Sequence, residues 1–200
     1  MNKKLKVLIC EDDYLVSQGI KSNIESLGHD VIAVAKNGKE AIDFALEKLP
    51  ELIIMDINMP IISGLIAIEK INKYINVPCI ILTAYYRDTL IKKASENGAL
   101  YYLIKPTTEY ELNAAINIVM ARYNELENLK SELNQTKEKL EARKYIEIAK
   151  GLLMDRYGLK EREAMVKIQK LSRDKNLKII DISKQIIELF KDKANSGTNL

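Results

Sequence analysis

The chain has 200 residues, 47% of them hydrophobic and 30% charged, which allows one large core or two small domains. It contains no run of the roughly 18 apolar residues that a membrane span needs, and its start lacks the apolar core of a signal peptide. We therefore expect a cytoplasmic protein with no membrane partner. Residues 143–193 hold 14 basic and 8 acidic side chains, and the remainder holds 17 and 20. This asymmetry predicts two modules with different partners.

The first part of the chain predicts an α/β fold. Short apolar segments alternate with segments of helical spacing, which indicates βαβ units and a doubly wound, flavodoxin-like sheet of five parallel strands. The segment 52–55 is apolar throughout, as is typical of a strand buried on both faces. The expected strands are 5–10, 31–34, 52–55, 77–83 and 100–104, and the expected helices are 14–27, 37–46, 65–74 and 87–97. The single histidine, His29, is expected to lie exposed in a loop.

Polar side chains stand at the ends of four of these strands. Glu11 and Asp12 follow the first strand, and Asp56 follows the third. If the strands are adjacent, the three carboxylates pool negative charge that needs a cation, and hard oxygen ligands of this kind suit Mg²⁺. Thr83 and Lys105 end two further strands and could hold the oxygens of a phosphoryl group carried by Asp56.

These motifs together resemble the receiver domain of two-component response regulators, over residues 1–122. The matching motifs, in order and spacing, are the acidic pair, Asp56-x-x-Met-Pro followed by Gly64, Thr83-Ala84 and Lys105-Pro106. The resemblance implies that Asp56 accepts a phosphoryl group from a sensor histidine kinase. It also implies that the Mg²⁺ ligands are Glu11, Asp12, Asp56 and the backbone carbonyl of Asn58.

Further roles follow from the same resemblance. Thr83 and Lys105 would contact the phosphoryl group, and Tyr102 would be the aromatic switch that turns inward on activation. The Lys105–Pro106 peptide bond would be cis, an uncommon geometry that would orient Lys105. The chain would then accept phosphate stoichiometrically and would not be an enzyme.

A long helix is predicted next, beginning near Thr108, where Glu111 completes a capping box. No helix breaker follows before Gly151. Apolar residues recur at seven-residue intervals at Leu112, Val119, Leu126, Leu133 and Leu140. This spacing predicts a connecting coiled coil over 108–146 that forms a homodimer on activation, although a lone amphipathic connector is an alternative. Polar partner positions at Thr136 and Lys137 predict weak pairing.

From residue 143 the pattern changes to a small three-helix module that reaches residue 191, followed by a polar tail, 194–200, predicted to be disordered. Residues 143–191 resemble the ANTAR transcription antitermination domain. The matching blocks are 146–154, 157–159, 163–164 and 181–182. The resemblance implies binding of RNA stem-loops in leader transcripts and antitermination of transcription.

The side chains of this module are of the types that bind RNA, because clustered cations suit phosphate contacts and an aromatic ring can stack on a base. Gly151 inside a helix costs roughly 1 kcal/mol against alanine, which close packing or close approach of a backbone would explain. The candidate RNA-contacting residues are Lys144, Lys150, Gly151, Arg156, Tyr157, Arg162, Lys167, Lys170 and Arg173.

Three other outputs are compatible with the composition of this module. DNA-binding domains are also small, basic and built from three helices, so a DNA-binding transcription factor is the first alternative. A helical module that docks only another protein is the second. A catalytic module is the weakest, because the last ~60 residues lack a paired base and nucleophile and a phosphate-binding glycine loop.

Overall fold

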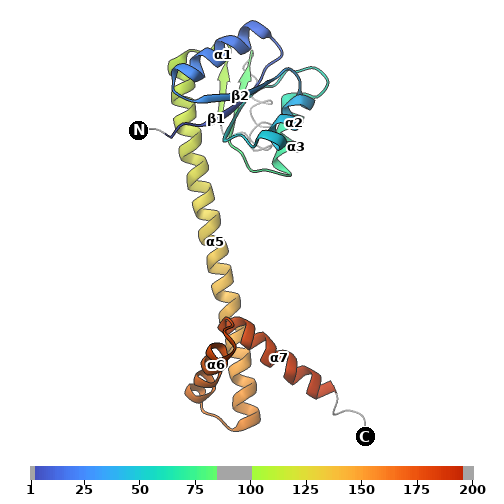
Figure 1. The fold of residues 1–200 in the computed structure, drawn as a ribbon, viewed down its shortest axis with the longest axis vertical. Helices are drawn as coiled ribbons and strands as arrows, with labels where there is room; N and C mark the ends of the chain where they lie inside the picture. Colours follow the sequence, from blue (N-terminus) through green and yellow to red (C-terminus); the bar gives the residue numbers. More distant parts are fainter. Residues whose placement is uncertain (1–2, 85–100, 196–200) are drawn as a thin grey trace. The chain divides into compact units, whose positions relative to one another are not determined.

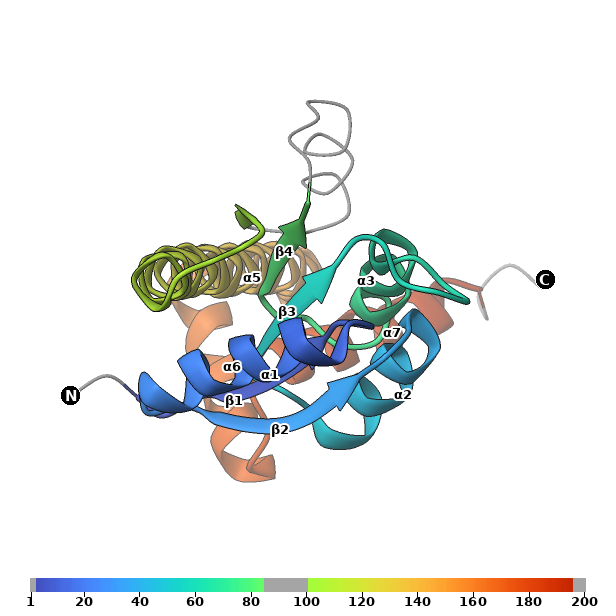
Figure 2. The same cartoon turned by 90° about the horizontal axis from the view of Figure 1, so that it is seen from above.

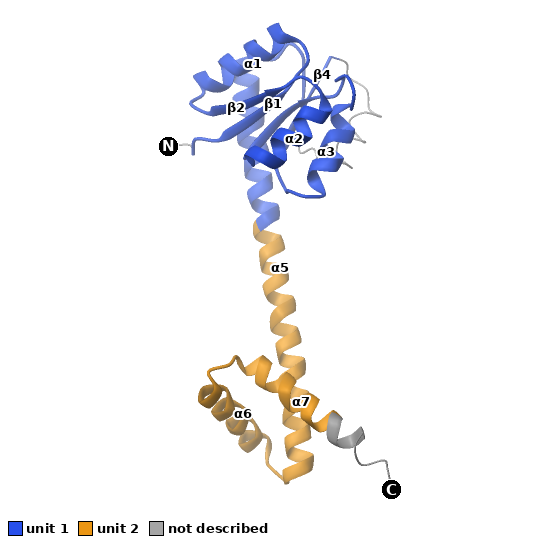
Figure 3. Cartoon of the chain, turned by 45° about the vertical axis from the view of Figure 1, so that its right-hand side comes forward, with its two compact units in different colours: residues 1–127 blue, residues 128–200 orange. Residues whose placement is uncertain are grey.

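The computed structural model describes residues 3–84 and 101–195, with side chains up to residue 191. The chain divides into two compact units, residues 1–127 and residues 128–200 (Figure 1, Figure 3). Among the described residues, no helix combines the length and the apolar character that crossing a membrane requires.

Unit 1 contains the predicted five-stranded parallel sheet, in the order β2-β1-β3-β4-β5. All five residues of β3 are buried, because this strand is central and both of its faces are covered, which explains its unbroken apolar run. The strands are β1 (Lys6–Cys10), β2 (Asp30–Ala35), β3 (Leu52–Asp56), β4 (Cys79–Thr83) and β5 (Tyr101–Ile104).

Helices cover both faces of this sheet. α1 (Tyr14–Ser26) and the first turns of α5 (Glu109–Tyr157) pack on one face, whereas α2 (Gly38–Lys48) and α3 (Gly64–Asn72) pack on the other (Figure 2). Each face has its own apolar cluster, so the sheet lies between two layers of helices as predicted. The helix predicted over 87–97 lies outside the described residues.

Local capping interactions explain where these helices begin. The carboxylate of Asp13 accepts hydrogen bonds from the backbone N–H groups of Leu15 and Val16, at 2.8 and 3.1 Å, and so begins α1. At α2 the side chains of Asn37 and Glu40 form the predicted capping box. The N–H of Glu40 donates to Asn37 over 2.9 Å, and Glu40 accepts from the preceding backbone.

His29 is buried rather than exposed, which corrects the expectation from the sequence. It is 8% exposed, and its Nδ1 accepts a hydrogen bond from the backbone N–H of Leu5 at 3.3 Å. Burial lowers the pKa of His29, because the charged imidazolium loses its hydration. The histidine therefore joins the loop that precedes β2 to the start of β1.

The loop after β3 holds a strained residue. Ile61 has φ of 69°, in the left-handed region, and its side chain is 77% exposed. A β-branched residue is disfavoured in this region, whereas asparagine is enriched there. We therefore expect Ile61→Asn to raise the free energy of unfolding by about 1 kcal/mol, measured by urea denaturation. Ile66→Asn, at an exposed helical position of α3, should bring no gain, and equal gains in both variants would rule out relief of strain.

Unit 2 is the predicted module of three helices. It comprises α5 from residue 128 onward, then α6 (Glu161–Lys175) and α7 (Ile179–Asn195). α5 ends at Tyr157, and the next residue, Gly158, has φ of 64° and donates its N–H to the carbonyl of Met154 at 2.9 Å, as in a glycine C-cap. The core residues of unit 2 are Ala149, Leu153, Ala164, Ile168, Ile182, Ile186 and Ile187.

The start of the disordered tail was predicted too early in the chain. α7 continues through Asn195, so residues 194 and 195 are helical, and the rest of the predicted tail lies outside the described residues.

Candidate functional site

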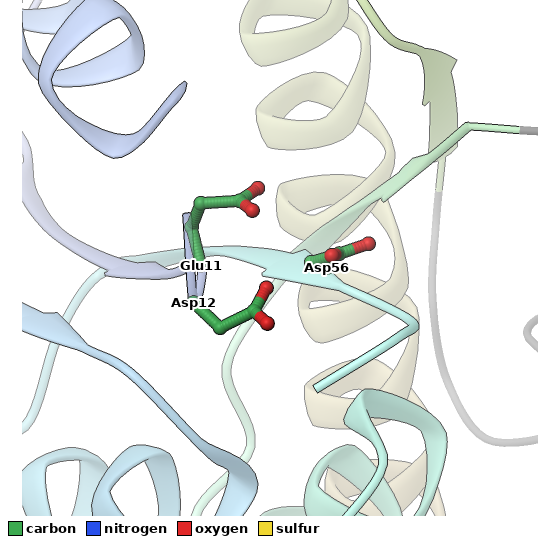
Figure 4. A group of neighbouring side chains, drawn as sticks. All are labelled: Glu11, Asp12 and Asp56. Carbon is green, nitrogen blue, oxygen red and sulfur yellow. The ribbon is translucent and has the colours of Figure 1, made fainter. Parts of the chain in front are cut away.

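The carboxyl edge of the sheet brings the predicted acidic residues together. β1 and β3 are neighbours with Cys10 opposite Met55, so the residues that follow them in sequence, Glu11 and Asp56, reach the same edge. Carboxylate oxygens of Glu11, Asp12 and Asp56 lie within 4.8 Å of one another (Figure 4). Glu11 and Asp56 are buried and Asp12 is exposed, so the group opens to solvent on one side.

Lys105 joins two of these carboxylates. Its Nζ lies 2.5 Å from Oε2 of Glu11 and 2.9 Å from Oδ2 of Asp56. Burial raises the pKa of Glu11, and the nearby ammonium group opposes that effect. Burial lowers the pKa of Lys105, but hydrogen bonds to Glu11 and Asp56 outweigh it, so the pKa is raised overall and the ammonium stays charged. The Lys105–Pro106 bond is cis, as predicted.

Thr83 and Tyr102 lie on the strands beside this group. Thr83 is the last residue of β4 and is 5% exposed, and its carbonyl accepts the backbone N–H of Lys105 at 2.8 Å. Tyr102 is half-buried on β5 and packs against the apolar cluster shared with α2 and α3. Four strand ends therefore place a hydroxyl, an ammonium and three carboxylates at one edge.

In unit 2, α6 presents a basic outer face. The positions 162, 166, 169, 170 and 173 follow the spacing of one helical stripe, opposite the buried residues Ala164 and Ile168. The stripe holds Arg162, Val166, Gln169, Lys170 and Arg173, three cations and no carboxylate. The two acids of the first turn have other partners, since Glu161 binds Lys150 and Glu163 accepts the N–H of Lys160.

An aromatic group adjoins this helix. The ring of Tyr157 is 55% exposed, Lys167 Nζ lies 4.2 Å from its centroid, and Phe190 meets it edge to face. A second pair, Lys184 over Tyr145 at 4.9 Å, was missed in the sequence, where its members are far apart. Both pairs are cation–π contacts that fix a lysine beside an aromatic ring.

Comparison with known proteins assigns both units. A family model described as the response regulator receiver domain matches residues 7–117, and the model of the ANTAR domain matches residues 134–187. This chain is a response regulator of the ANTAR type. The two domains indicate a regulator rather than a catalytic enzyme.

Similar proteins agree with this assignment. The transcriptional regulatory protein PdtaR of Mycobacterium tuberculosis is 32% identical over 183 residues, covering 92% of this chain and 89% of PdtaR. YdfI of Bacillus subtilis, also a transcriptional regulatory protein, is 38% identical and covers 66% of this chain and 68% of its own length. A LuxR-family two-component response regulator from Aurantimonas matches in structure with a TM-score of 0.57 and 27% identity, over 60% of this chain and 86% of the other.

The acidic pocket of the receiver domain fits the metal that this family binds. Receiver domains bind Mg²⁺ at an acidic pocket, and the pocket here offers carboxylate oxygens from Glu11, Asp12 and Asp56. Such hard oxygen donors, few in number and open to water on one side, are what Mg²⁺ prefers.

The backbone of Asp56 lies so close to residue 64 that only glycine fits there. A Cβ atom on Gly64 would lie 2.0 Å from the backbone oxygen of Asp56. We expect Gly64→Ala to lower the free energy of unfolding by about 1–3 kcal/mol and to slow phosphorylation, because the loop must move away from Asp56. Gly19→Ala is the matched control, since a Cβ there meets no atom within 4 Å. Urea denaturation and labelling with acetyl phosphate measure the two effects, and a Gly64→Ala protein as stable as the wild type would contradict them.

Lys150, one of the candidate RNA-contacting residues, is buried and paired with two carboxylates. It is 8% exposed, and its Nζ lies 2.9 Å from Glu147 and 2.6 Å from Glu161. Hydrogen bonds to Glu161 and then Glu147 raise its pKa. The lysine therefore joins α5 to the first turn of α6 inside the ANTAR domain.

We expect Lys150→Met to lower the thermal stability of the ANTAR domain and to leave the salt dependence of RNA binding unchanged. The reason is that Lys150 already has two carboxylate partners. Lys191→Met, at an exposed position on α7, is the control for loss of charge alone. Calorimetry and salt-titrated binding make the measurement. A reduced salt slope with unchanged stability would return Lys150 to the candidate RNA-contacting residues.

Two further expectations need correction. Among the described residues, nothing outside its own helix packs closely on Gly151, since a Cβ atom there would meet no atom within 4 Å. Leu112 and Val119 are fully buried against the receiver sheet, where a partner helix cannot reach them. A seam on α5 is therefore restricted to the later leucines, which are exposed.

Proposed function

We propose that this response regulator binds RNA stem-loops in leader transcripts, that phosphorylation of Asp56 promotes this binding, and that the result is transcription antitermination. The observation that carries the proposal is the outer stripe of α6, with Arg162, Lys170 and Arg173 and no carboxylate. Guanidinium and ammonium groups on one helix face match a row of phosphates.

Phosphorylation uses the groups at the edge of the receiver sheet. A carboxylate oxygen of Asp56 attacks the phosphorus of a phosphohistidine on a sensor kinase, so that an O–P bond forms and the N–P bond breaks. Lys105 lies beside Asp56 and would neutralise a phosphoryl oxygen, and Thr83 would donate its hydroxyl to another. Mg²⁺, when bound, supplies positive charge to the transferring group, and its protein ligands would be Glu11, Asp12, Asp56 and the carbonyl of Asn58.

The ANTAR domain offers two kinds of RNA contact. The α6 stripe, with exposed Arg156 and Lys144 on α5, would bind phosphates. Tyr157 would stack on an unpaired base of the loop, and Lys167 beside its ring would bind a neighbouring phosphate. Val166 and Gln169 lie within the stripe and would contact the groove or the loop between those phosphates.

The probe for the binding experiment is chosen from RNA that crosslinks to this protein in its host cells. A stem-loop from that RNA and a DNA duplex of the same sequence are then compared in a gel shift with the phosphorylated protein. The proposal expects tighter binding of the stem-loop. Tighter binding of the duplex would favour a DNA-binding transcription factor. Absence of binding to either at low salt would favour a module that docks another protein.

A further inference from the structure

Two side chains of α5 bind the same residue, Asn76, at the point where this helix leaves the receiver domain. The hydroxyl of Tyr123 donates a hydrogen bond to the backbone carbonyl of Asn76 at 2.9 Å, and the side-chain amide of Asn76 donates to Oε1 of Glu127 at 2.7 Å. Tyr123 and Glu127 are half-buried, whereas every residue from 128 to 141 is exposed. We call these two hydrogen bonds the Asn76 clamp, and they lie at the end of the receiver unit.

The clamp fixes α5 to the backbone as well as to the side chain of Asn76. Because Tyr123 binds the main-chain carbonyl, a movement of the backbone at Asn76 acts directly on the helix. Burial, and then the carboxylate of Glu127, raises the pKa of Tyr123, so its hydroxyl keeps the proton that it donates.

Asn76 lies in the link between α3 and β4, and the other ends of both elements reach the phosphorylation edge. The backbone N–H of Ile57, the residue after Asp56, donates to the carbonyl of Leu82 on β4 at 3.2 Å. The carbonyl of Ile57 accepts the N–H of Gly64, the first residue of α3, at 3.0 Å. A shift of the backbone beside Asp56 is therefore passed to Asn76 along two elements.

The packing around these elements leaves room for movement at α5 rather than inside the sheet. All five residues of β4 are buried, and close packing makes such a strand move as a unit. A cavity of about 260 Å³ lies between α5 and the start of β1, lined on the helix side by Ile116 and Met120 and on the other side by Leu5 and His29. The helix therefore has space beside it in which to shift once the clamp opens.

We propose that the Asn76 clamp holds α5 to the receiver domain while Asp56 is unphosphorylated and opens when Asp56 is phosphorylated. Attraction of Thr83 to the phosphoryl group would draw β4 toward the carboxyl edge of the sheet, away from α5 at the opposite edge. Hydrogen bonds of this length are largely lost when they lengthen by about 0.5 Å, so a small shift is enough. The inference rests on phosphorylation of Asp56 as proposed above, but not on RNA binding.

Hydrogen exchange of the full chain, with and without beryllofluoride as a mimic of the phosphoryl group, tests the clamp. In the wild type, the amides of residues 121–127 are expected to exchange on the order of tenfold faster with beryllofluoride, because this part of α5 loses two hydrogen bonds to the receiver domain. Tyr123→Phe removes only the hydroxyl, and it should exchange faster already without beryllofluoride. Tyr110→Phe removes the same atom from the same helix at a position that is 83% exposed, and it should behave like the wild type.

Labelling with acetyl phosphate separates failure of the clamp from failure of phosphorylation. Label on Asp56 together with unchanged exchange at residues 121–127 would overturn the clamp and leave the proposed function standing. Absence of label on the wild type would overturn both.

Exchanging donor and acceptor tests the second bond of the clamp. Asn76→Asp places a carboxylate opposite Glu127, so the clamp should open and exchange should speed up without beryllofluoride. Adding Glu127→Gln restores one amide and one carboxylate in reversed positions, so the double variant should recover slow exchange. A double variant that exchanges as fast as Asn76→Asp alone would contradict this bond of the clamp.

The affinity for beryllofluoride gives a readout that a merely structural contact would not change. Coupling between two sites is reciprocal, so a clamp that phosphorylation opens must itself oppose phosphorylation. Tyr123→Phe should therefore bind beryllofluoride on the order of tenfold more tightly than the wild type, measured by fluorine NMR, whereas Tyr110→Phe should not. Equal affinities in Tyr123→Phe and the wild type would overturn the proposal.

Discussion

A protein carrying Asp56→Asn is expected to take up no phosphoryl group from labelled acetyl phosphate, while its fold and stability stay close to those of the wild type. The amide is nearly isosteric with the carboxylate but lacks the nucleophilic oxygen anion. It would still accept a hydrogen bond from Lys105, whose Nζ lies 2.9 Å from Oδ2 of Asp56.

Asp13→Asn provides the control for this result. Asp13 lies two residues after Glu11, and its carboxylate caps α1, a role that asparagine fulfils equally well. Its phosphorylation should match that of the wild type. Label on Asp56→Asn at the wild-type rate would show that another residue is the phosphoacceptor.

The second large effect concerns the ANTAR domain. Replacing Arg162, Lys170 and Arg173 together by alanine is expected to reduce the slope of log affinity against log salt by about two units, because each lost phosphate contact removes about 0.7–0.9. All three side chains are exposed, so thermal stability should hardly change.

A matched triple variant distinguishes the effect of the α6 stripe on RNA binding from the effect of losing the same positive charge elsewhere. Lys36, Lys39 and Lys70 are exposed in the receiver domain, and their replacement by alanine removes the same charge. RNA binding by that variant should keep the wild-type salt slope. Equal loss in both triple variants would mean that net charge, rather than the α6 stripe, drives binding.

The sequence predicted the receiver fold well because its signals are local. The run 52–55 indicated a buried strand without reference to the rest of the chain, and all of β3 is buried. Asn37 with Glu40, and Thr108 with Glu111, marked helix starts that the structure confirms. Parallel strands then bring their carboxyl ends to one edge, so the meeting of Glu11 with Asp56 followed from topology.

The features that the sequence did not predict depend on tertiary contacts. Leu112 and Val119 share the seven-residue spacing of the later leucines, but their surroundings differ, because only the first turns of α5 pack on the sheet. Lys150 has a charged partner, Glu161, that only the return of α6 along α5 brings near. His29 is buried beside Leu5, the residue before β1, whose backbone N–H donates a hydrogen bond to it. No local pattern distinguishes these cases.

The most direct test of the central claim is the dissociation constant for the RNA stem-loop with and without beryllofluoride. Wild-type protein is expected to bind on the order of tenfold more tightly with beryllofluoride, the usual range for coupling between two sites. Asp56→Asn, which cannot hold the phosphoryl mimic as the carboxylate does, should show the weaker constant under both conditions. Identical constants for the wild type in the two states would contradict control of RNA binding by phosphorylation at Asp56.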